Sequence, residues 1–90
     1  MKTLTAMTLA ATMLAAPAFA NKISCDSGEQ SAWMSQDAIL TIARDLGYET
    51  RRVKVERGCY EVYAISPKGE RVEAFFNPTN GELVGVKAGN

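Results

Sequence analysis

A helical pattern of apolar residues precedes a longer stretch in which apolar and polar residues alternate. Over residues 36–46, apolar side chains recur at the three- and four-residue spacing of one helix face. Ser35 can cap the first turn, and Gly47 suits the left-handed conformation that ends many helices. The pattern therefore predicts one amphipathic helix, whose core-facing residues are Ile39, Ile42, Ala43 and Leu46.

After residue 49 the period changes to two, which is typical of strands with one buried face. Groups of glycine, proline and asparagine divide this stretch into short segments and predict tight turns between them. The strands are expected at residues 50–56, 59–66, 70–76 and 82–86, and the turns at 57–58, 67–69 and 77–81.

The first hairpin admits two registers. A two-residue turn at residues 57–58 places Val55 opposite Tyr60 and aligns the apolar faces, whereas a three-residue loop would oppose Val55 to Cys59. We expect the two-residue turn, although Arg57 is unfavourable at positive φ. In the second hairpin the expected pairs are Ala64 with Val72, Val62 with Ala74 and Tyr60 with Phe76.

These elements predict an α+β fold with two layers, in which one helix packs on a four-stranded antiparallel meander sheet. The core would consist of the apolar helix face and the matching sheet face. Val84 and Val86 of the last strand are expected on the core side, together with Val53, Val55, Val62, Ala64, Val72, Ala74 and Phe76.

The first twenty residues have the pattern of a secretory signal peptide. Lys2 gives a positive start, residues 4–16 form an apolar run, and residues 18–20 form a small-x-small cleavage site. An N-terminal amphipathic helix is the alternative, but the run is apolar on all sides. We expect cleavage after Ala20 and a periplasmic or secreted product that is not inserted in a membrane. Residues 21–32 would then form an irregular arm, and residues 33–90 the domain.

Charge and composition exclude some classes of function. The chain has ten basic and ten acidic residues, and its densest basic spot, Arg51-Arg52, is flanked by Glu49 and Glu56. Nucleic-acid binding is therefore not expected. The chain has no histidine, and its sequence has no phosphate-binding glycine loop or nucleophile motif, so we expect no catalytic residue, no metal site and no cofactor.

Two cysteines, Cys25 and Cys59, lie in the part expected to be exported. An even number of cysteines in an exported chain predicts a disulfide, which would stabilise a domain with a thin core. A redox-active dithiol is the alternative, but the two cysteines of such a pair are normally separated by only two intervening residues.

One sheet face is apolar without an obvious cover. Tyr63, Ile65 and Phe75 fall on the face opposite the helix, together with Cys59. Either the arm that carries Cys25 folds back with Trp33 and covers them, or Tyr63, Ile65, Phe75 and Trp33 form a partner-binding face.

Two segments resemble the PepSY domain: residues 58–63, Gly-Cys-Tyr-Glu-Val-Tyr, and residues 77–83, Asn-Pro-Thr-Asn-Gly-Glu-Leu. The resemblance extends over residues 33–86. It departs from the family pattern at Asn77, where aspartate is common, and at Asn80, which adds a residue before the glycine. PepSY domains occur in propeptides of secreted thermolysin-type metalloproteases and in stand-alone exported proteins.

The resemblance implies an exported, non-catalytic module that binds or regulates a protein partner, with a peptidase acted on in trans as one candidate. The family offers no catalytic residues to carry over. The alternatives are a structural or envelope protein, and a small-ligand binder that uses the apolar sheet face. The sequence does not specify an oligomeric state.

Overall fold

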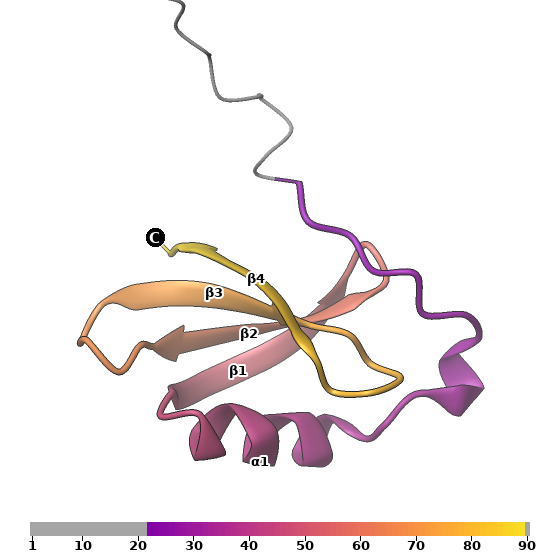
Figure 1. Ribbon diagram of the computed structural model, residues 1–90, viewed down its shortest axis with the longest axis horizontal. Helices are drawn as coiled ribbons and strands as arrows, with labels where there is room; N and C mark the ends of the chain where they lie inside the picture. The colour runs from indigo at the N-terminus through magenta and orange to yellow at the C-terminus, as the bar shows by residue number, and fades with distance from the viewer. Residues whose placement is uncertain (1–21, 90) are drawn as a thin grey trace, which may run out of the picture.

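The computed structural model of the chain describes residues 22–89 (Figure 1). The expected signal peptide, residues 1–20, lies outside the described residues. One helix lies under one face of a four-stranded antiparallel sheet with strand order β1-β2-β3-β4, as predicted (Figure 1). The elements are the short 3-10 turn η2 (Gln30–Ala32), helix α1 (Gln36–Asp45) and strands β1 (Glu49–Glu56), β2 (Cys59–Ile65), β3 (Arg71–Phe76) and β4 (Leu83–Ala88).

Helix α1 begins and ends where the sequence predicts, within one residue. The hydroxyl oxygen of Ser35 accepts a hydrogen bond from the backbone N–H of Ala38 at 3.1 Å, which satisfies one of the free donors of the first turn. Gly47 has φ 98° and ends the helix in the left-handed region. Ile39 and Ala43 are buried and pack the helix onto the sheet.

The β1–β2 turn has two residues, both with positive φ, 50° at Arg57 and 79° at Gly58. Val55 consequently faces Tyr60, so the predicted register is confirmed. A Cβ atom at Gly58 would overlap the carbonyl oxygen of Cys25, so the close approach of the N-terminal arm also requires glycine here.

Strand pairing in the second hairpin is also as predicted. Tyr60 faces Phe76, and the following pairs are Val62 with Ala74 and Ala64 with Val72. An irregularity that the sequence did not indicate lies in β1, where the register shifts between Thr50 and Arg52 and leaves Arg51 as an extra residue.

The core lies between α1 and the sheet, but it does not extend to every predicted position. Leu46 is 49% exposed and Val55 is 43% exposed, and Val84 and Val86 are exposed to a similar degree. The expectation for Val86 was wrong because α1 packs against β1 and β2 and leaves the helix-side face of edge strand β4 uncovered. The expectation for Val84 was wrong because this residue lies at a register shift between β3 and β4, where strand alternation is interrupted. Leu83 contacts the core from β4 instead. The buried cluster consists of Ile39, Ala43, Tyr60, Val62, Ala64, Val72, Ala74 and Phe76.

The buried Tyr60 joins the core to the segment that precedes α1. Its hydroxyl donates a hydrogen bond to the carbonyl oxygen of Met34 at 2.8 Å. We expect Tyr60→Phe to lower the free energy of unfolding by about 1 kcal/mol, because the bond is lost while the ring stays packed. Urea denaturation measures this. Tyr48→Phe is the control, at a half-buried ring whose hydroxyl has no hydrogen bond within residues 22–89, and equal losses in both variants would contradict the prediction.

Candidate functional site

The sheet face that points away from α1 is called the outer face. Strand pairing shows which side chains share it, because residues opposite each other in adjacent strands point to the same side. Arg52 faces Tyr63, Lys54 faces Glu61, and Glu73 faces both Tyr63 and Lys87. The outer face therefore gathers residues from all four strands, namely Arg52, Lys54, Cys59, Glu61, Tyr63, Ile65, Arg71, Glu73, Phe75 and Lys87.

One end of the outer face is covered by the N-terminal arm, here residues 22–29. Cys25 and Cys59 form a disulfide, which confirms the predicted pairing. The backbone N–H of Cys25 donates to the carbonyl oxygen of Arg57 at 3.0 Å, and the hydroxyl of Ser27 donates to that of Gly58 at 2.7 Å. The arm is thus held against the β1–β2 turn on the side of the sheet opposite α1 (Figure 1).

Farther along, the arm reaches β4 through Ile23. A Cβ atom at Gly85 would come within 2.8 Å of the Ile23 Cδ1 atom, so the glycine makes room for this side chain. Gly85 is the strand partner of Phe75, and Phe75 is only 2% exposed. The arm accordingly covers the part of the outer face that contains Phe75.

Trp33 lies on the other side of the sheet. Its ring meets Tyr60 edge to face with 5.4 Å between centroids, and its Nε1–H donates to the carbonyl oxygen of Ser27 at 3.0 Å. Of the four residues expected to share one face, the structure brings together Tyr63 and Ile65, both half-buried, whereas Phe75 is covered and Trp33 packs against the core. Partner binding at Tyr63 and Ile65 stays a prediction.

Two glutamates lie in the middle of the outer face and are almost fully buried. Glu61 is 3% exposed and Glu73 is 7% exposed. Lysines from the two edge strands flank them, with Lys54 Nζ at 4.0 Å from Glu61 Oε1 and Lys87 Nζ at 3.6 Å from Glu73 Oε1. We call these two acids the glutamate pair.

Burial disfavours the charged form of Glu61 and raises its pKa to about 7. A hydrogen bond from the protonated Glu61 to the Glu73 carboxylate, and repulsion between the two acids when both are charged, raise this pKa further, and Lys54 opposes them more weakly. The glutamate pair can therefore hold one proton at near-neutral pH.

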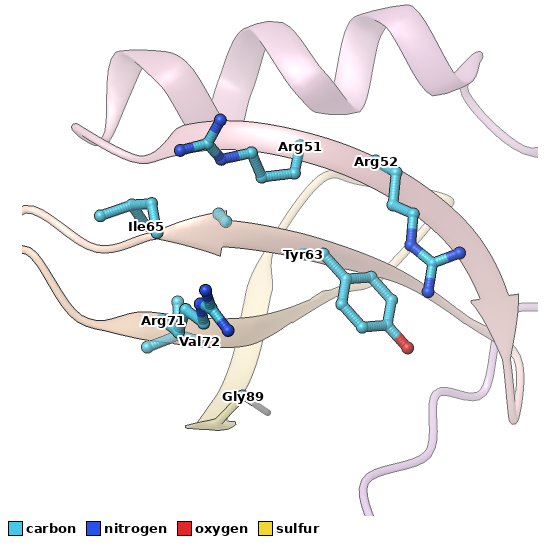
Figure 2. Close-up of a pocket in the computed structure, with 8 residues that line it drawn as sticks. Arg51, Arg52, Tyr63, Ile65, Arg71, Val72 and Gly89 are labelled. Carbon is cyan, nitrogen blue, oxygen red and sulfur yellow. The ribbon is translucent and has the colours of Figure 1, made fainter.

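The other end of the outer face, away from the arm, is hollowed into a pocket of about 340 Å³ (Figure 2). The Arg52 guanidinium lies 4.3 Å from the centre of the Tyr63 ring, and Arg51 forms an ion pair with Glu49 at 3.3 Å. Figure 2 shows Arg51, Arg71 and Ile65 around the end of the sheet. We call it the arginine pocket; its lining is Arg51, Arg52, Tyr63, Ala64, Ile65, Arg71, Val72 and Gly89.

The sequence alone does not indicate this pocket. Arg51 and Arg52 are flanked by Glu49 and Glu56 along the chain, and Arg71 lies far from them in sequence. The predicted strand register could have indicated it, because that register places Arg71 opposite Ile65 at the end of β3. The irregularity at Arg51 adds a second arginine to the same end of β1.

The outer face combines aromatic surface, guanidinium groups and a buried acid pair. Within residues 22–89, no three residues among the cysteines, aspartates and glutamates are arranged to hold a metal ion. No helix in this same range is long and apolar enough to cross a membrane.

Comparison with known proteins gives one family. No curated protein and no solved structure matches the chain. The profile of the PepSY_2 family, described as peptidase propeptide and YPEB domain, matches residues 4–87. That span takes in the helix, all four strands and the outer face, and it agrees with the resemblance found in residues 58–63 and 77–83. The chain belongs to the PepSY_2 family of peptidase propeptide and YPEB domains.

Proposed function

We propose that the protein is an exported, non-catalytic PepSY module that binds a protein partner through the open end of its outer face. The observation that carries this proposal is the unequal cover of that face. The arm buries Phe75, while Tyr63 and Ile65 stay half-exposed beside the arginine pocket. A partly apolar surface that the fold leaves open beside a pocket is typical of a binding site.

Two further features support the proposal. The family description names peptidase propeptides, so a peptidase acted on in trans is the first partner class to examine. The first twenty residues have the pattern of a signal peptide, and export agrees with the disulfide between Cys25 and Cys59.

The function is tested with the oxidised domain that begins at Asn21, immobilised and exposed to the exported protein fraction. In parallel, the same domain is assayed as an inhibitor of a thermolysin-type metalloprotease. We expect Tyr63→Ala to weaken retention or inhibition about tenfold, because an aromatic side chain at a binding surface commonly contributes 1.4 kcal/mol or more.

The matched control is Leu46→Ala, which removes an exposed apolar side chain on the other side of the molecule. Both variants must keep the circular dichroism spectrum of the parent domain. Equal retention by Tyr63→Ala and Leu46→Ala, or no specific retention and no inhibition by the parent domain, would contradict the proposed function.

A small-ligand binder is the second candidate, and the volume of the arginine pocket favours it. At about 340 Å³ the pocket falls at the lower end of the range for small-molecule sites. Under this alternative, Tyr63→Ala would abolish binding of a small exported molecule and leave protein retention unchanged.

A further inference from the structure

The arginine pocket has a charge composition that differs from that of the chain as a whole. The whole chain has equal numbers of basic and acidic residues, yet the pocket lining contains three arginines and no carboxylate. Glu49, outside the lining, offsets the charge of Arg51, and the lining as a whole still carries an excess of positive charge.

Arginine side chains at this site suit an oxyanion. A guanidinium presents five N–H donors in a planar fork that matches the two oxygens of a carboxylate. Arg51 can therefore keep its ion pair with Glu49 and still donate to a ligand. Arg52 is held over the face of the Tyr63 ring, which restricts its orientation before any ligand binds.

The rest of the lining argues for a ligand with apolar parts. Tyr63 and Ile65 contribute apolar surface between the arginines (Figure 2). A small inorganic oxyanion would fill a fraction of about 340 Å³ and leave this surface in contact with water. A carboxylate side chain beside an aliphatic residue, in an extended peptide, satisfies both parts of the lining.

We propose that the arginine pocket binds an acidic peptide segment, in which separate carboxylates contact Arg52 and Arg71 and an apolar side chain between them packs on Tyr63 and Ile65. This inference deepens the proposed function, since it gives the chemistry of the segment that a protein partner would present. Binding through charge complementarity also makes the interaction sensitive to salt, because the arginines lie at the surface.

The probe is an acetylated, amidated pentapeptide with two glutamates flanking a leucine, titrated into the ¹⁵N-labelled oxidised domain. We expect shift changes at Tyr63, Ile65 and Arg71, and about tenfold weaker binding of the same peptide with glutamines in place of glutamates. Arg52→Gln and Arg71→Gln should each weaken binding of the glutamate peptide several-fold.

Arg57→Gln is the matched control, because it removes the same charge at the opposite end of β2, in the turn. Arg52→Lys keeps the charge but loses the planar fork, so its affinity should lie nearer to that of Arg52→Gln than to the parent. This variant also serves if Arg52→Gln does not fold.

Equal affinity for the two peptides, or equal losses in Arg57→Gln and Arg71→Gln, would overturn the inference. Competition by inorganic phosphate at the same concentration as the peptide would also overturn it, since the pocket would then be a general oxyanion site. These measurements need no partner protein. Loss of peptide binding with Tyr63-dependent partner retention intact would refute this inference alone, and loss of partner retention with peptide binding intact would refute the proposed function alone.

Discussion

Removal of the Cys25–Cys59 disulfide will lower the free energy of unfolding by roughly 3–4 kcal/mol. The bond joins residues 34 positions apart, and the entropy lost by closing a loop of this length in the unfolded chain has about this magnitude. Small domains are stabilised by about 5–15 kcal/mol in total, so the loss is a large fraction. The prediction is checked by urea denaturation of the oxidised protein and of a Cys25→Ser, Cys59→Ala double variant.

Alanine is chosen at position 59 because Cys59 is fully buried, and a serine hydroxyl there would add a separate cost. Wild-type protein reduced by a thiol provides a control that changes no side-chain volume except at the two sulfurs. The reduced wild-type protein and the double variant should unfold at similar urea concentrations, lower than that of the oxidised protein. A difference below about 1 kcal/mol between the oxidised and reduced proteins would contradict a stabilising role for the bond.

The same bond decides how much of the outer face is open. The arm is held by the disulfide and by two short hydrogen bonds to the β1–β2 turn, and its Ile23 packs on Gly85. Without the disulfide the arm has few contacts to keep it over Phe75. A protein that loses this link would expose a second apolar area next to the glutamate pair.

The predictable part of the fold was the part where local signals agree. The turn chemistry at residues 67–69 and the alternation of Val62 and Ala64 point to one register for the second hairpin, and that register is observed. In the first hairpin the match of apolar faces, and not the turn residue Arg57, favoured the register that is observed. Both ends of the helix were also predictable, since Ser35 caps the first turn through its side chain and Gly47 ends the helix through its own backbone conformation.

The features that the sequence did not show depend on what lies above each strand. Strand alternation places Val86 on the same sheet face as the core residue Ala74, but α1 does not extend over β4 on that side. Strand alternation places Glu61 and Glu73 on the face away from the helix, yet both are buried there opposite the aromatic side chains of Phe75 and Tyr63. Strand alternation predicts the sheet face on which a side chain lies. Whether that side chain is buried depends on the element that packs on that face.

Only those parts of the candidate site that follow from strand alternation were predicted from the sequence. Tyr63 and Ile65 were placed correctly on the outer face because they follow from strand alternation. The position of Trp33 could not be inferred, since the path of the arm after Cys25 depends on tertiary contacts such as the bond from the Trp33 ring to Ser27. The arginine pocket required an irregularity at Arg51 that no turn residue marks.

Glu61→Gln will stabilise the protein at alkaline pH and change little at acidic pH. The pKa of Glu61 is raised from the ordinary 4.5 to about 7, chiefly by burial, so the folded state binds this proton more tightly than the unfolded state does. The favourable contribution of the protonated group is complete below about pH 4.5, is lost as the pH rises to 7, and stays absent above. One pKa unit corresponds to about 1.4 kcal/mol, so a shift from 4.5 to about 7 corresponds to a loss on the order of 3–4 kcal/mol.

Glutamine retains the shape and a hydrogen-bond donor toward Glu73 but cannot ionise, so the variant should not show this decline. Urea denaturation at pH 4, 6 and 8 measures the difference between variant and wild type, which should grow from near zero to about 3–4 kcal/mol. Glu70→Gln, at an exposed position in the β2–β3 turn, is the control and should differ from wild type by the same amount at every pH.

The charged groups around Glu61 are Lys54 and Glu56 from β1, and Glu73 from β3. If their interactions, and not burial, held Glu61 ionised at pH 6, the two glutamine variants would show parallel profiles and the assignment of the proton to the glutamate pair would fail.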